Sequence, residues 1–340
     1  MEGRKLQLAG GSTFVVSLPK RWVQNAGLKA GDTLFLDAQS DGSMSVRYRN
    51  ADKPAVRRKV FNEKGEEVRD HLLRKLIGAY ISGYGLIEVR FTADRGPFAR
   101  RVARDFCRLV IGPEVIEETR HGLVIQDLSD TSELSSEKCL RRMHLMVRAM
   151  LEDAILALKS ADSTLAHDVT LRDQDVDRLY WMVAKQYNQT VALPPGVPGR
   201  EASSAIHGHR LVAKLLERIG DHAQRIAETF STLVNGKKLD AKLQRELEEA
   251  NASAIAILDQ SFNALMAGDI DAANEAIDRR VQHQKLVDAL SHKVAGRKGE
   301  ELLALGTVVD SLGRVASYSA DIAEQAINAG VQLDSAEATA

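Results

Sequence analysis

The sequence is poor in three features: long apolar runs, cysteines and net charge. No run of about eighteen apolar residues occurs in the 340 residues, and residues 1–5 do not start an apolar signal core, so we expect no transmembrane segment and a cytoplasmic location. The two cysteines, Cys107 and Cys139, have no metal-binding spacing, and both fall in segments that look helical. This argues against a disulfide framework and predicts small core residues.

The net charge of -1 conceals an asymmetry along the chain. Residues 1–60 contain eleven Lys and Arg against five Asp and Glu, which leaves the remainder acidic. An anionic partner is therefore expected at the front of the chain. With 44% hydrophobic and 27% charged residues, the composition is typical of a soluble globular protein, and the length allows two or three domains.

Residues 1–50 are predicted to form short strands around one short helix that begins at Pro19. Gly27 suits the end of that helix, and Asp41-Gly42 between two apolar runs indicates a hairpin. A unit of this size buries little surface alone, so we expect it to pair with a second copy and make the chain a homodimer.

Four cations of this region stand out: Arg4, Lys5, Lys20 and Arg21. Lys20 and Arg21 fall in the first helical turn, where the helix dipole disfavours positive charge, which suggests contact with a phosphate backbone. The alternative is a basic surface that serves solubility only. Arg4–Gln7, Ser17–Trp22 and Gly27–Asp32 resemble the AbrB/SpoVT family. That resemblance implies a swapped-hairpin dimer that presents basic residues to DNA.

Residues 56–130 are predicted to form a small α/β domain with the order strand, helix, strand, helix, hairpin. Its second helix, 97–110, carries Arg100, Arg101, Arg104 and Arg108 opposite an apolar stripe. These arginines either add to an anion-binding surface or form a solvated helix face.

Residues 134–330 are predicted to be all-helical, with two sets of three helices at 136–234 and 239–329. The expected helices cover 136–160, 163–189, 201–234, 241–267, 270–294 and 299–329. Ala213–Glu228 can be laid over Val309–Glu324, which indicates an internal duplication.

Two acidic pairs in the first repeat suggest a metal site. Glu217 and Asp221 stand four residues apart, and a step of 100° per residue puts them opposite the apolar stripe of Leu211, Leu215 and Ile219. Asp173 and Asp177 have the same spacing on the preceding helix. Four carboxylates converging from facing helices would favour a hard or borderline cation, and the alternative is an ordinary solvated acidic face.

The second repeat has no such acidic pairs. In the register of the duplication, Gly313 and Ser317 take the places of Glu217 and Asp221. The stretch that corresponds to the other pair contains Arg279, Arg280, His283 and Gln284. The second repeat is expected to keep its packing without these acids. This argues against a purely structural role for the acidic pairs of the first repeat.

The segments Leu216–Ala223 and Asp173–Tyr180 resemble the acidic motifs of the PhoU family. Members are tandem three-helix bundles that regulate phosphate uptake and bind metal clusters. Together with the AbrB-like front, the chain resembles archaeal phosphate-uptake regulators that join both parts. Transferred to this sequence, the resemblance implies a metal set of Asp173, Asp177, Glu217 and Asp221, holding iron, manganese, magnesium or zinc.

The preferred interpretation is a homodimeric transcriptional regulator whose helical domain senses phosphate status and whose N-terminal domain binds DNA. An acidic surface repels phosphate, so sensing would pass through a bound metal or a partner protein. The alternative is an interaction protein without DNA binding, which docks on a phosphate transporter ATPase or a sensor kinase. A carboxylate-bridged metalloenzyme is disfavoured because neither acidic motif supplies the Glu-x-x-His ligands of di-iron sites.

Overall fold

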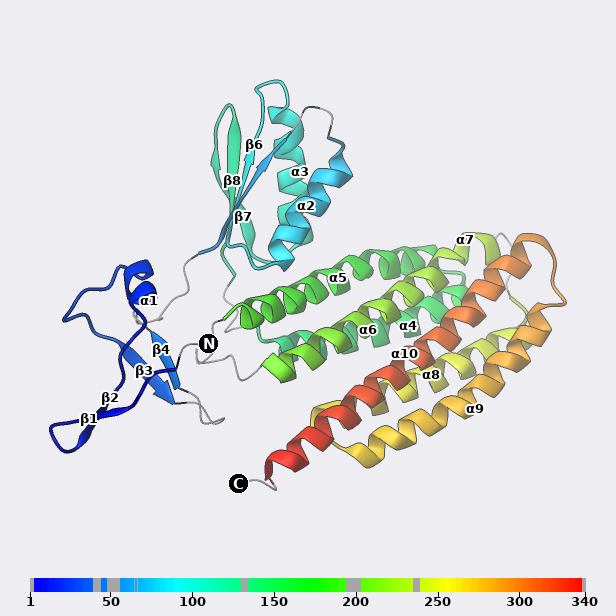
Figure 1. Cartoon of the computed structure of the whole chain (residues 1–340). Coiled ribbons are helices and arrows are strands. Elements are labelled where there is room, and N and C mark those ends of the chain that lie inside the picture. The colour runs from blue at the N-terminus through cyan, green and yellow to red at the C-terminus, as the bar shows by residue number, and fades with distance from the viewer. Residues whose placement is uncertain are drawn as a thin grey trace. The chain divides into compact units, whose positions relative to one another are not determined.

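The computed structural model describes residues 3–38, 44–47, 56–63, 65, 67–129, 134–193, 203–234 and 239–337. The chain divides into two compact units, one formed by residues 1–55 with 193–200 and one by the rest (Figure 1).

The first unit consists of two antiparallel hairpins and one short helix. Strands β1 (Gln7–Ala9) and β2 (Thr13–Val15) pair around Gly10 and Gly11, whose φ angles of +61° and +80° suit glycine. Strands β3 (Phe35–Ala38) and β4 (Met44–Arg47) form the second hairpin, as predicted. The predicted Asp41-Gly42 turn lies outside the described residues.

Helix α1 (Lys20–Asn25) separates the hairpins, and Pro19 precedes it as the N-cap instead of occupying the first helical position. The described part of this unit contains no buried residue. Its large apolar side chains face solvent in a single copy, and they are Leu6, Leu8, Phe14, Val15, Val16, Phe35, Leu36 and Met44. Exposed apolar surface of this extent leaves the unit without a core of its own.

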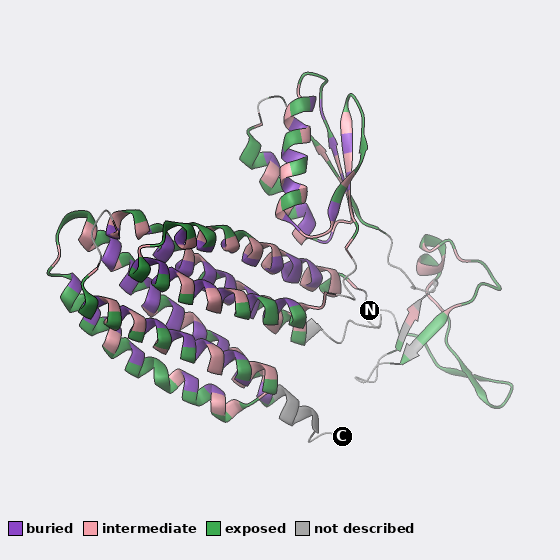
Figure 2. Ribbon diagram, turned by 180° about the vertical axis from the view of Figure 1, so that it is seen from behind, coloured by how far each residue is buried: buried purple, intermediate pink, exposed green. Residues whose placement is uncertain are grey.

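The second unit begins with the small α/β domain that the sequence predicts. Its elements are β5 (Arg58–Asn62), α2 (Arg69–Ile81), β6 (Leu86–Arg90), α3 (Gly96–Leu109), β7 (Pro113–Glu118) and β8 (Gly122–Asp127). The sheet order is β5-β6-β8-β7, with β5 and β6 parallel and the other two pairs antiparallel. Helices α2 and α3 cover one face of this sheet (Figures 1 and 2). Leu76, Tyr80 and Phe106 belong to the hydrophobic core of this domain.

The helical region follows with six long helices and one short turn of helix. They are α4 (Ser136–Ser160), α5 (Ser163–Val191), α6 (Ser203–Glu228), α7 (Phe230–Leu233), α8 (Ala241–Ala267), α9 (Ile270–Val294) and α10 (Gly299–Glu337). The predicted bounds of α4, α8 and α9 are confirmed, whereas the helix predicted to run to residue 234 ends at Glu228 and α10 continues to Glu337. None of the described helices is long and apolar enough to cross a membrane.

These helices form two three-helix bundles that share one hydrophobic core. Helices α4, α5 and α6 pack together, as do α8, α9 and α10, and the bundles meet where α10 contacts α6 and α4 contacts α8. The predicted duplication is visible in the burial pattern. Val212, Leu216 and Ile219 of α6 are buried, and so are Val308, Leu312 and Val315 at the matching positions of α10.

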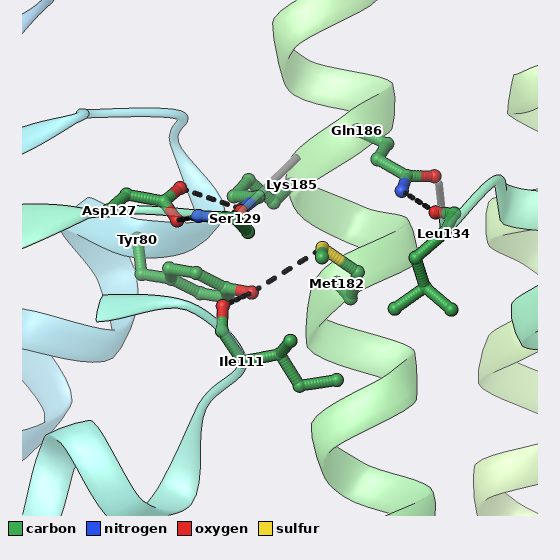
Figure 3. Close-up of polar contacts among 8 residues, drawn as sticks. All are labelled: Tyr80, Ile111, Asp127, Ser129, Leu134, Met182, Lys185 and Gln186. Atoms are coloured by element: carbon green, nitrogen blue, oxygen red, sulfur yellow. Dashed lines mark hydrogen bonds and ion pairs between the residues drawn. The ribbon is translucent and has the colours of Figure 1, made fainter. Parts of the chain in front are cut away.

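The α/β domain is attached to the bundle by a buried polar contact (Figure 3). The Lys185 ammonium of α5 donates to Asp127 Oδ2 at 2.7 Å and to Ser129 Oγ at 2.8 Å. It also lies 4.6 Å from the ring centroid of Tyr80, whose hydroxyl donates to the Ile111 carbonyl at 3.0 Å. Burial lowers the pKa of Lys185, while Asp127 opposes that shift. The contact therefore joins two layers of the molecule through a charge that is closed to solvent.

Candidate metal centre

The four predicted metal ligands lie on two adjacent helices of the first bundle. Asp173 and Asp177 lie on α5, and Glu217 and Asp221 lie on α6, which packs along α5 (Figure 1). Asp173 and Glu217 are each only 8% exposed, whereas Asp177 and Asp221 are half-buried. The carboxylates lie along the contact between α5 and α6, called the acidic groove below, instead of on a solvated face.

This placement corrects the predicted orientation of α6. Leu211, expected in the core, is 40% exposed, and the buried positions next to it are Val212 and Ala213. Helix α6 contacts α4, α5 and α10 at once, so its buried arc is wider than a single stripe. Glu217 falls within that arc, where it faces the interior and not the solvent.

Gly220 lets the two helices approach closely at the site. A Cβ atom at this position would lie 3.2 Å from Asp173 Oδ1 and 3.5 Å from Val147 and Val176. The Asp173 carboxylate therefore rests against the backbone of α6, in space that any larger residue would fill.

The electrostatics of the group disfavour four negative charges without a counterion. Burial raises the pKa of Asp173 to about 6, and the neighbouring Asp221 and Glu217 carboxylates contribute to the shift. Burial raises the pKa of Asp177 to about 7, with Asp173 and Glu217 adding to it. The pKa of Glu217 is also raised by burial, although the hydrogen bond from Lys214 opposes the change.

Two oxygens of the group are buried and make no hydrogen bond in the described structure: Asp173 Oδ1 and Glu217 Oε2. The other oxygen of Glu217 accepts a hydrogen bond from Lys214 Nζ at 2.5 Å. Buried acceptors without a partner cost free energy, and a hard cation would offset that cost. The donor set thus fits an oxygen-liganded metal ion.

The side chains do not yet form a closed cage. Among the described residues, no three His, Cys, Asp or Glu side chains are grouped closely enough to hold a metal as they stand. Lys214, which the sequence analysis missed, could have been noticed from its i,i+3 spacing to Glu217.

Among the described residues of the second bundle, the positions that match the acidic pairs carry no equivalent acidic group. Ser317 donates to the Gly313 carbonyl of its own helix at 3.0 Å, and a Cβ atom at Gly313 would lie in ordinary contact with Val287 at 3.5 Å. The Arg280 guanidinium acts to lower the pKa of Asp321, although burial raises it overall. The two repeats therefore differ in charge while sharing their packing.

The predicted DNA-contacting residues lie in the first unit, and Arg4, Lys5, Lys20 and Arg21 are all exposed. Lys20 and Arg21 are the first two residues of α1, whose first turn contains no acidic residue. Their side chains are thus available to an anionic partner on a surface that a second copy would extend.

The fold and the site together define a tandem three-helix-bundle protein with an acidic groove, an α/β domain and a basic N-terminal β unit. Comparison with protein families shows that residues 140–230 match the PhoU domain. Residues 7–47 match the antidote-toxin recognition MazE family of bacterial antitoxins. These matches confirm the PhoU resemblance and the AbrB-like fold class of the front, while the archaeal part of the resemblance remains a prediction.

Curated relatives carry the same family name. A phosphate-specific transport system accessory protein PhoU homolog of Caulobacter vibrioides is 30% identical over 123 residues, which are 36% of this chain and 50% of the relative. The chain thus spans about half the length of that relative. A protein of the same name from Xylella fastidiosa is 24% identical over 231 residues, which are 65% of this chain and 87% of the relative.

Solved structures show the same fold. PhoU from Pseudomonas aeruginosa superposes with a TM-score of 0.53 at 20% identity, over 58% of this chain and 97% of that protein. The phosphate transport system regulatory protein PhoU from Streptococcus pneumoniae gives a TM-score of 0.52 at 20% identity, over 59% and 95%. The helical region thus has the PhoU fold.

Proposed function

We propose that this chain regulates phosphate transport, with a metal-binding helical region and an N-terminal unit that binds DNA as a dimer. The observation that carries the proposal is the acidic groove between α5 and α6, in which Asp173 and Glu217 are buried with unpartnered oxygens. The names of the relatives, which refer to phosphate-specific transport, support the process in which the chain takes part.

In this proposal Asp173, Asp177, Glu217 and Asp221 hold the ion, which is iron, manganese, magnesium or zinc. A bound cation would supply a positive centre on a surface that otherwise repels phosphate. The carboxylates would lose their protons on binding, because both aspartates with raised pKa values are partly protonated near neutral pH. A phosphate group or an acidic segment of a partner could then bind to the same surface.

Metal content measured by mass spectrometry tests this assignment. The full chain is stripped with a chelator and incubated in turn with each of the four metals, and so are Asp177→Asn and Glu217→Gln. Asp175→Asn is the matched control, because Asp175 lies on the same helix and pairs with Arg178 outside the groove. Loss of bound metal in the two groove variants alone is expected, and equal content in all four proteins would refute the site.

The N-terminal part of the proposal rests on exposed apolar residues and exposed cations in one unit. Phe14 is 66% exposed and Leu36 is 65% exposed in a single copy, so a second copy would bury them. The resulting dimer would present Arg4, Lys5, Lys20 and Arg21 twice. A twofold arrangement of cations suits a DNA backbone, whose charge dominates affinity.

Fluorescence anisotropy with duplexes from the chain's own promoter region tests DNA binding. Affinity should fall as salt rises, and the quadruple variant Arg4→Gln, Lys5→Gln, Lys20→Gln, Arg21→Gln should lose most of it. Sedimentation should show a dimer for both proteins. Binding that is insensitive to salt and survives the four substitutions would contradict the DNA function.

A second candidate function is an interaction protein that docks on a phosphate transporter ATPase or a sensor kinase. The word accessory in the names of the relatives favours it. In that case the N-terminal unit only dimerises, and the quadruple variant would behave as the unaltered protein in every DNA assay.

A further inference from the structure

The outer face of the α/β domain carries four arginines that we call the arginine face: Arg74, Arg101, Arg104 and Arg108. Arg74 lies on α2 opposite Leu72 and Leu76, and the other three lie on α3 opposite its buried stripe. Both helices cover the same face of the sheet, so these positions point away from it (Figures 1 and 2). All four residues are exposed.

The arginine face differs from six other arginines of this domain. Those are held within the domain: Arg57 by the Ser82 carbonyl, Arg58 and Arg90 by Glu88, Arg69 by Asp105, Arg95 by Glu63 and Arg100 by Glu118. By contrast, the four guanidinium groups of the arginine face make no ion pair or hydrogen bond with any residue that the structure describes.

The acidic side chains of the two helices are paired with a different arginine. Asp70 and Asp105, the acidic residues of α2 and α3, both bind Arg69. The arginine face therefore carries like charges that make no polar contact with the described part of the domain. Such a cluster is mildly unfavourable in the free protein, and an anionic ligand would reverse that.

The shape and chemistry of the face suit a phosphate backbone. Arg101, Arg104 and Arg108 form one stripe that extends about 10 Å along α3 at 1.5 Å per residue. The planar guanidinium binds two phosphate oxygens at once, which a lysine cannot do. Three such groups in a row can therefore contact consecutive phosphates of one strand.

The surroundings of the arginines argue against a membrane partner. A helix that binds anionic lipid buries apolar side chains among its cations. Here the large apolar residues of α3, such as Val102 and Phe106, are buried in the domain core. The surface therefore presents positive charge but no exposed large apolar side chain of α3 that could insert into a membrane.

We propose that the arginine face binds the phosphate backbone of the same duplex DNA that the N-terminal units hold. This inference rests on the proposed DNA function, because covalent attachment to a DNA-bound unit supplies the high local concentration of duplex that the face needs. It assigns the α/β domain a role that increases affinity without reading sequence, since phosphate contacts position a protein and do not specify bases.

The experiment compares full-length proteins on a long promoter duplex at several salt concentrations. The triple variant Arg101→Gln, Arg104→Gln, Arg108→Gln should bind about tenfold more weakly at low salt. Its plot of log affinity against log salt should be shallower by about 2 to 3 per chain. A triple Arg→Lys variant should keep most of the salt slope, because the charge remains.

The control removes three exposed cations from the second bundle: Lys242→Gln, Arg245→Gln and Arg279→Gln. It should bind DNA like the unaltered protein. Circular dichroism should show equal helix content in all variants, since every substituted side chain is exposed.

The outcomes separate this inference from the DNA function itself. If the arginine-face variant binds normally while the N-terminal quadruple variant does not, the inference is wrong and the DNA function stands. If neither variant loses affinity, both are wrong. If the arginine-face variant loses binding only to phosphatidylglycerol vesicles and not to duplex, the face is a membrane surface and the inference is overturned.

Discussion

Lys185 and Asp127 form an ion pair that joins the helical bundle to the α/β domain, with 2.7 Å between Nζ and Oδ2. The lysine side chain is fully buried. The same helix carries Asp173 and Asp177, and eight residues from Asp177 to Lys185 correspond to about 12 Å along α5. The first two residues of the acidic groove and the lysine that attaches the α/β domain thus lie on the same helix, α5.

Lys185→Met should destabilise the protein by about 3–5 kcal/mol, because it leaves the Asp127 carboxylate buried without its cation. The free energy of unfolding in urea, followed by circular dichroism, measures the effect. Adding Asp127→Asn should restore part of the loss, since the remaining group is neutral.

The control for this prediction is Lys159→Met, which breaks an exposed pair with Glu248 at 2.6 Å. Exposed pairs contribute at most about 1 kcal/mol. Equal losses in Lys185→Met and Lys159→Met would mean that the buried pair has no special role in attachment.

The metal-free protein should become more stable as pH falls from 8 to 5. The pKa values of Asp173 and Asp177, about 6 and 7, lie above the ordinary 3.8, so the fold favours their protonated forms. Their contribution to stability is complete below pH 4 and is lost as pH rises through 6 to 7. Urea midpoints measured in a chelator at pH 5, 6, 7 and 8 test this.

Asp177→Asn should accordingly stabilise the metal-free protein at pH 8 by about 1–2 kcal/mol and flatten the pH dependence. With metal present the same substitution should destabilise, because a ligand is lost. If Asp177→Asn changed the stability in the same direction with and without metal, the proposed link between carboxylate repulsion and metal binding would be contradicted. Asp175→Asn serves again as the control on the same helix.

Gly220→Ala should weaken metal binding, because its Cβ would lie 3.2 Å from Asp173 Oδ1 and displace the carboxylate. Metal content and affinity measure the loss. Gly208→Ala on the same helix meets no atom within 4 Å, so it should leave metal binding unchanged. It should also stabilise the protein by roughly 0.5–1 kcal/mol through helix propensity. If both substitutions affected metal binding equally, close helix approach would not be what positions Asp173.

The ends of most helices could be predicted from local chemistry. Asp162 and Asp269 accept hydrogen bonds from the first turns of α5 and α9, so the sequence itself specifies where these helices begin. The grouping of Asp173, Asp177, Glu217 and Asp221 on neighbouring helices was also predictable, from i,i+4 spacing and the bundle architecture.

The depth of the site was not predictable in the same way. Glu217 is buried because three helices surround α6, and a single apolar stripe does not reveal how many neighbours a helix has. Lys185 and Asp127 are 58 positions apart in the chain, so no local sequence pattern predicts their contact. Sequence periodicity thus predicts faces of helices, whereas partners across domains depend on the tertiary fold.

Helix α5 is longer than α9, its counterpart in the second repeat. Ala166, Val169 and Val183 of α5 are buried like Ala273, Ala276 and Leu290 of α9. In that alignment α9 ends one turn early, and the additional turn of α5 contains Asn188, which donates to the Ile81 carbonyl of the α/β domain at 2.7 Å. The additional turn of α5 thus lies where the α/β domain contacts this helix. Among related proteins, the longer helix and the α/β domain should therefore be gained or lost together.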